Sequence, residues 1–243
     1  MNSGILQSVT AMDTAMTEDM GFLGMMQSLD AFFPVGAFTL SNGLEDYVLR
    51  DRIQNGKDLE NYIQGFLQIF PYSDLGIVSL AYRNARSREA ILELDAVGTV
   101  MKGASEVRNG SIRMGRRYMK ARAAIGDSGE MLAWYQQCVQ AGTASGLHPA
   151  AIGLYGAEKG LPEEMVLTMY GYSVLSAIVN NCVKLVPLSP VEGQRVLFSS
   201  MKDLGRAVAY AMKTDIMDLG VSGCGMEIHC MNHEELYSRQ YMS

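Results

Sequence analysis

Apolar residues recur along most of the chain at the three- and four-residue spacing of amphipathic helices. Between residues 57 and 70 the apolar side chains fall at positions i, i+3, i+4 and i+7, which predicts a helix that Pro71 ends or kinks. The spacing resumes after this proline and predicts a second helix over residues 74–83. Further helices are predicted over residues 88–101, 106–124 and 131–141.

Proline and glycine mark the helix ends in the second half of the chain. Pro149 suits the first turn of a helix, and Gly160 suits the position just past its end. Pro162 opens the next helix, where two glutamates follow at the positive end of the helix dipole. Ser189 begins a Ser-Pro-Val-Glu sequence with capping-box spacing, so another helix is predicted over about residues 190–212.

These patterns predict an all-α fold. No alternating positions predict paired strands, and the stretch 183–188 is too short and isolated to form a sheet. We therefore expect a single helical-bundle-like domain over residues 22–219. A flexible N-terminal arm over residues 1–21 and a partner-binding C-terminal tail over residues 220–243 complete the expected organisation.

Charge and cysteine content narrow the classes of protein. The 20 basic and 26 acidic side chains give a net charge of −6, so we expect no overall attraction to nucleic acid or to an anionic membrane. The chain has no run of about 18 apolar residues and no basic leader of a secretory signal. The cysteines at 138, 182, 224 and 230 do not suggest a disulfide framework, so a cytoplasmic protein is the simplest interpretation.

The usual catalytic motifs are missing from the sequence. It contains no G-x-x-x-x-G-K-[ST] phosphate loop, no G-x-S-x-G elbow and no H-E-x-x-H helix. The glycine-rich stretch 220–225 lacks the lysine of a phosphate loop and is interpreted as a flexible connection to the tail. These absences favour a protein that is not an enzyme.

One group of residues offers metal ligands. Cys224, His229, Cys230 and His233 lie within ten residues and supply thiolates and imidazoles, which suit zinc or nickel. Their spacing matches no common closed zinc pattern, so a polar tail that serves a protein interface is the favoured alternative. The 18 methionines are interpreted as adaptable core and interface packing rather than as metal ligands.

A basic stripe runs along the helix predicted over residues 106–124. Arg113 and Arg117 are four residues apart, as are Arg116 and Lys120, so each pair lies one helical turn apart. Like charges at this spacing repel each other. The stripe, with Arg108 earlier in the helix, is interpreted either as a solvated face or as a contact surface for an acidic partner.

Three segments together resemble the urease accessory protein UreF family. Residues 32–45 read FFPVGAFTLSNGLE and resemble the family segment FPxGxxxxSxGLE. Residues 181–189 read NCVKLVPLS and, with the Gly-Gln that follows, resemble VKLVPLxxxxGQ. Residues 233–243 read HEELYSRQYMS and resemble HExxYSRLFxS. The similarity keeps one order over about residues 22–243, although Leu40 and Gln240 depart from it, so no histidine-based function is assigned to the first segment.

Membership of this family implies an all-α homodimer without a catalytic nucleophile. It implies a complex with UreD (also called UreH) and the GTPase UreG, which inserts nickel into apo-urease in a GTP-dependent way. GTP would then bind to UreG only, and nickel would at most be in transit through this chain.

The resemblance directs attention to the tail as the surface that binds UreD. Its aromatic and charged residues suit an interface, and so short a segment is expected to order on binding. The expected contact residues are His233, Glu234, Tyr237, Ser238, Arg239 and Tyr241, with Tyr170, Tyr172 and Lys184 near the surface that faces UreG. Two alternatives stay open: a nickel-binding metallochaperone that uses the Cys/His group, and a regulator of the GTPase that inserts an arginine of the basic stripe.

Overall fold

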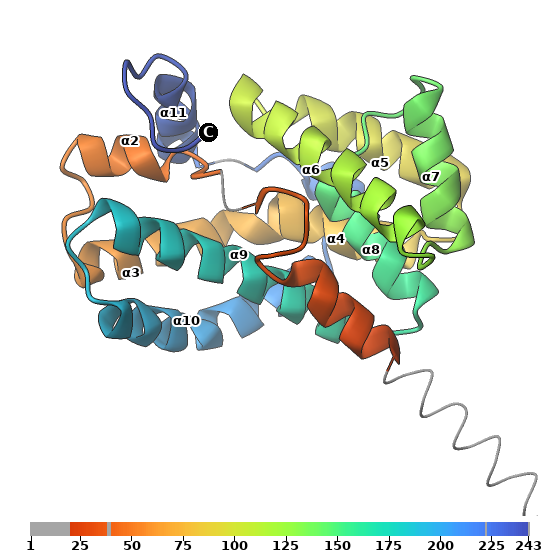
Figure 1. The fold of residues 1–243 in the computed structure, drawn as a ribbon, viewed down its shortest axis with the longest axis horizontal. Coiled ribbons are helices and arrows are strands. Elements are labelled where there is room, and N and C mark those ends of the chain that lie inside the picture. The colour runs from red at the N-terminus through yellow and green to blue at the C-terminus, as the bar shows by residue number, and fades with distance from the viewer. Residues whose placement is uncertain (1–19, 38–39, 222, 243) are drawn as a thin grey trace, which may run out of the picture.

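The computed structural model describes residues 20–37, 40–221 and 223–242. These residues form helices and connecting turns, with no strand among them, so the predicted all-α fold is confirmed. Most of the predicted N-terminal arm lies outside the described residues, apart from the start of a helix over residues 20–29. Figure 1 shows the helices gathered around the central pair α4 and α8.

The labelled helices follow one another with short connections. They are α2 (Leu44–Leu49), α3 (Gly56–Ile69), η2 (Phe70–Tyr72), α4 (Asp74–Arg83), α5 (Arg88–Val100), α6 (Ser105–Ala124), α7 (Glu130–Gln140), α8 (His148–Glu158), α9 (Glu163–Leu185), α10 (Pro190–Ala211), η3 (Ile216–Asp218) and α11 (Cys224–His233).

The predicted helix ends fall close to the observed ones because the local signals work as expected. Pro71 lies in the short 3₁₀ turn η2 between α3 and α4. The hydroxyl of Ser189 accepts a hydrogen bond of 3.1 Å from the backbone N–H of Glu192 and so caps α10. Gly160 adopts a φ of 68° just beyond α8, a left-handed conformation that glycine tolerates best.

The core lies where α4 and α8 pack together. Residues 75–81 of α4 and 148–156 of α8 are all buried. The two backbones approach so closely that a Cβ on Gly153 would lie 2.3 Å from the carbonyl oxygen of Val78. A residue with no side chain is therefore required where these helices meet.

A buried arginine fixes the helix over residues 20–29 against the bundle. The guanidinium group of Arg122 donates to Asp127 at 2.9 Å and to Gln27 at 3.1 Å. It also lies 4.4 Å from the centre of the Tyr155 ring and 4.9 Å from that of Phe33. Because its charge is paired and stacked, the arginine can be fully buried without the full desolvation cost.

Helix α9 passes a length and composition test for a membrane span. It has 23 residues, and its most apolar window has a mean hydropathy of 1.3, but half of that window is buried inside the fold. A core helix of a globular protein passes the same test, so this is weak evidence for a span.

Helix α11 was not predicted from the sequence. The stretch 220–225 was expected to be a flexible connection, yet a helix begins at Cys224. Only His233 of α11 is buried, so the helix has no apolar face that periodicity could detect. It packs on α2 and on the beginning of α6, at one end of the molecule (Figure 1).

Candidate functional site

Segments far apart in sequence meet beside α11. The side chain of Asn181, in α9, donates to the carbonyl oxygen of Leu40 at 2.9 Å. The hydroxyl of Tyr241 donates to the carbonyl oxygen of Asn181 at 3.4 Å, and its ring is buried. The backbone N–H of Tyr241 donates to Glu45 at 3.1 Å. All three segments that resemble the UreF family therefore contribute to one contact region.

A buried histidine lies at the centre of this region. His233 is 0% exposed and lies between two carboxylates. Its Nε2 is 3.0 Å from Glu45, and its Nδ1 is 2.8 Å from Glu106. The three side chains form a triad that joins α11 to α2 and α6.

The residues after α11 extend this triad. Arg239 forms an ion pair with Glu106, and the backbone N–H of Gln240 donates to Glu45 at 2.7 Å. Both carboxylates therefore bind two parts of the tail, α11 and the segment 239–241. In the isolated chain the tail is folded onto the body without a partner, because α2 and α6 supply the charges that hold it.

Glu234 serves a different role, as the cap of α6. Its carboxylate accepts hydrogen bonds from the backbone N–H of Ser105 at 2.7 Å and of Glu106 at 3.2 Å. Burial acts to raise the pKa of Glu234, but these hydrogen bonds outweigh it and, with nearby Arg108, lower the pKa below its ordinary value. The start of α6 has no side-chain cap from its own N-cap residue, so the tail supplies it.

A second histidine of α11 also contacts α2. The Nδ1 of His229 lies 2.6 Å from Asp46, which also accepts from Arg50 at 2.8 Å. The imidazole lies against the ring of Tyr47, with the two ring centres 3.6 Å apart. Both tail histidines are thus engaged with carboxylates of the body.

The candidate Cys/His metal group is not assembled in the part of the chain that the structure describes. Among the described residues no three His, Cys, Asp or Glu side chains are placed to hold a metal ion. Helical geometry turns Cys224 to the exposed side of α11, while Cys230 lies beneath Gly43, where an added Cβ would be 2.9 Å from its Sγ. Burial raises the pKa of the Cys230 thiol to about 12, which disfavours the thiolate that a metal would need.

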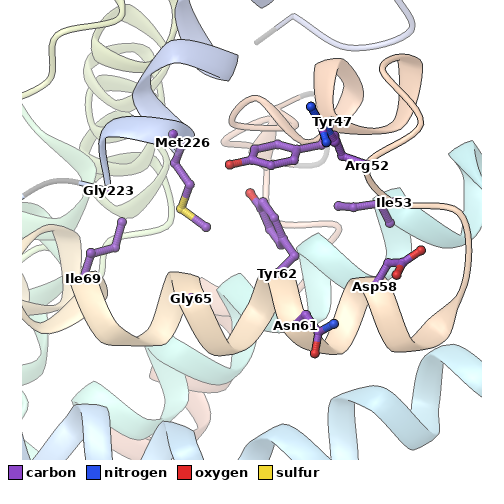
Figure 2. A pocket seen from close by; sticks show the side chains of 11 residues that line it. Tyr47, Arg52, Ile53, Asp58, Asn61, Tyr62, Gly65, Ile69, Gly223 and Met226 are labelled. Carbon is purple, nitrogen blue, oxygen red and sulfur yellow. The ribbon is translucent and has the colours of Figure 1, made fainter.

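An open groove lies between α3 and the beginning of α11 (Figure 2). Its volume is about 410 Å³. Tyr47 and Tyr62 face each other at its centre with their ring centres 5.1 Å apart, and Met226 points in from α11. Asp58 and Asn61 lie along α3 at its edge.

The structure distributes the expected partner-contact residues unevenly. Tyr237 is fully exposed, Ser238 and Lys184 are exposed, and Tyr172 is 44% exposed. Tyr170, which we expected near a partner surface, is 3% exposed and lies in the core. The reason is helical register, because Tyr170 follows the buried Val166 by one turn, whereas Tyr172 points about 200° away.

The basic stripe of α6 is also divided. Arg113, Arg116 and Arg117 are exposed on one face. Arg108 lies roughly 140° around the helix from Arg113. Its guanidinium group donates to the carbonyl oxygen of Lys102 at 2.7 Å, so it is tied to the connection between α5 and α6.

Sequence reasoning missed the carboxylates that hold the tail. Glu45 was noted only as the last residue of a family-like segment, and Glu106 and Asp46 were not selected at all. Glu45 and Asp46 lie in the first turn of α2, where acidic residues are common in any helix. What distinguishes them is that they are buried, and burial is not known before the fold is known.

Comparisons with known proteins agree with this architecture. A family model described as UreF matches residues 53–201, more than half of the chain. The chain is 32% identical to "Urease accessory protein UreF" of Actinobacillus pleuropneumoniae serotype 3 (strain JL03), over 92% of this chain and 100% of that protein. Proteins of the same name from Haemophilus influenzae (strain PittEE) and Paenarthrobacter aurescens (strain TC1) are also 32% identical. They cover 93% and 91% of this chain, and 96% and 97% of their own length.

The matches define the class of protein as an accessory factor, with a role in urease maturation. The chain belongs to the UreF family, which confirms the resemblance found in the three sequence segments.

Proposed function

We propose that this protein is a non-catalytic docking subunit that joins UreD (UreH) and the GTPase UreG in a complex that inserts nickel into apo-urease. UreG binds and hydrolyses the GTP. This chain binds no cofactor tightly, and nickel passes through or beside it. The protein acts as a homodimer in the cytoplasm and binds neither nucleic acid nor membrane.

The observation that carries this proposal is the way in which the tail presents Tyr237. His233 and Arg239 are both held by carboxylates of the body, and Tyr237 lies between them, fully exposed. A large aromatic side chain that is exposed on a segment fixed at both ends suits the centre of an interface. Because the segment is already ordered, its binding costs less conformational entropy than that of a free tail.

Replacement of Tyr237 by alanine tests this proposal. Loss of a central aromatic anchor of an interface typically costs about 2 kcal/mol or more, so we expect UreD to bind at least roughly 30-fold more weakly. The measurement is the affinity of the purified variant for UreD, with Tyr210→Ala as the control. Tyr210 is 60% exposed on α10, away from the tail.

Equal UreD affinity for Tyr237→Ala, Tyr210→Ala and the unmodified protein would contradict the role proposed for the tail. Failure of the unmodified chain to co-purify with either UreD or UreG would reject the docking function as a whole.

The proposal places the contact with UreG near the exposed residues of α9. Lys184 and Tyr172 are both accessible there. We expect Lys184→Glu to reduce recovery of UreG while UreD remains bound, because the reversed charge leaves Tyr237 and the carboxylates that hold the tail unchanged. Equal recovery of UreG with this variant would exclude Lys184 from that surface.

A further inference from the structure

Four cationic side chains share one face of α6. Arg113, Arg116, Arg117 and Lys120 lie within about 100° of the helix circumference, and all four are exposed. We refer to these four residues as the α6 cationic face. The opposite side of the helix is in close contact with the bundle, since a Cβ on Gly115 would lie 2.1 Å from the carbonyl oxygen of Gly146. The helix is therefore fixed with its charges outward.

No carboxylate of the described chain neutralises this face. Arg113 and Lys120 have no hydrogen bond or ion pair within residues 20–37, 40–221 and 223–242. Arg116 donates to the carbonyl oxygen of Ser145 at 3.0 Å and Arg117 to that of Val35 at 3.4 Å, and both acceptors are uncharged. Among the residues that the structure describes, none of these four charges, which repel one another at one-turn spacing, has a carboxylate partner.

The carbonyl contacts also give the face a defined shape. They hold two guanidinium groups in place while leaving other N–H donors of each group free. Phe32 lies three residues before Val35, the residue that accepts from Arg117, and it is 95% exposed, although its neighbour Phe33 is buried against Tyr118. Exposed arginines and an exposed aromatic side chain are enriched in protein interfaces.

We propose that the α6 cationic face, together with Phe32, docks an acidic protein surface whose carboxylates repeat at one-turn helical spacing. A guanidinium group binds a carboxylate through two parallel N–H donors. Two arginines one turn apart on α6 have the same spacing as two glutamates one turn apart on a facing helix, so each arginine can pair with one glutamate. The net charge of −6 disfavours binding of a polyanion such as RNA, because the many phosphate charges of RNA are repelled by the negative charge of the whole protein. This inference rests on the proposed function for its setting, a partner within the urease maturation complex, and adds the chemistry of that partner.

The test uses the full-length protein and a defined acidic probe. A fluorescent helical peptide of about 20 residues with Glu at every fourth position is titrated with the protein at low salt, and binding is followed by anisotropy. We compare the unmodified chain with the double variant Arg113→Glu/Lys120→Glu, because neither side chain forms a hydrogen bond or ion pair with the described residues. The matched control is Arg195→Glu/Lys202→Glu on α10, which makes the same change in net charge on exposed residues.

We expect the α6 double variant to bind the peptide at least about tenfold more weakly, and the α10 control to change less than about twofold. Phe32→Ala is expected to weaken binding of a second peptide that carries leucines beside its glutamates, without changing the melting temperature. Equal weakening by the α6 and α10 variants would overturn the proposal, as would tighter binding of single-stranded RNA than of peptide through the same residues. UreD affinity measured on the same variants separates this result from the tail contact, because that affinity depends on Tyr237.

Discussion

Removal of the Glu45 carboxylate should release the tail. In Glu45→Ala, the imidazole of His233 and the backbone N–H groups of Gln240 and Tyr241 lose their shared acceptor. Hydrogen bonds to charged groups contribute about 1.5–3 kcal/mol each, and loss of one member of a buried ion pair costs about 3–5 kcal/mol. Water replaces part of these contacts once the tail opens, so we expect a net shift of about 4 kcal/mol, or roughly 1000-fold in the closed-to-open ratio.

Native-state hydrogen exchange measures this opening directly. The exchange of amides in residues 234–242 should accelerate by up to about 1000-fold, limited by their protection in the unmodified protein, while amides of α4 and α8 stay protected. Glu235→Ala is the control, because Glu235 is exposed and its carboxylate has no hydrogen bond or ion pair within the described part of the chain. The reasoning fails if the Gln240 and Tyr241 amides keep their protection, or if the core loses protection to the same extent.

Three further predictions concern the body of the protein. Burial lowers the pKa of His148 from 6.5 to about 4, so the folded state binds fewer protons than the unfolded state between these values. The free energy of unfolding is therefore not reduced by His148 above about pH 6.5, and it falls by about 3 kcal/mol as the pH drops to 4. Urea titrations of His148→Phe should lack this part of the pH dependence. Gly153→Ala should lower the melting temperature by about 6–12 °C through backbone overlap with α4, whereas Gly65→Ala, with nothing within 4 Å of the added Cβ, should not. Asp95→Asn should cost about 2–3 kcal/mol in chemical denaturation, because the carboxylate accepts from the N–H groups of Ser145 and Gly146 ahead of α8; an unchanged midpoint would mean that the amide replaces it.

The helices could be predicted because their signals are local. Ser189 and Pro190 define the start of α10 by the contacts of a few neighbouring residues, and the apolar spacing of α3 reflects the face that it buries. Helix α11 lacks both signals, since it starts with a cysteine and a glycine and buries one polar side chain. Its position depends on α2 and α6, which no local pattern describes.

The candidate site could be predicted only in part for the same reason. The family-like segments identified the regions that meet, including His233 and Arg239. They could not identify the partners of those residues, because Glu45 and His233 are 188 positions apart and only the packing of α2 against α11 brings them together. The position of Tyr170 was misjudged because a step of two residues, a rotation of about 200° around α9, separates the core Tyr170 from the surface Tyr172.

The triad of His233, Glu45 and Glu106 forms late in the synthesis of the chain, because it needs residues from both ends. Glu45 and Glu106 leave the ribosome well before His233 and Arg239, so the body can fold while both carboxylates still face water. If translation stopped before residue 233, the helices of the body would carry Glu45 and Glu106 without their tail partners, and Tyr237 would be missing. A chain interrupted there would lack the side chain through which we propose that the protein binds UreD.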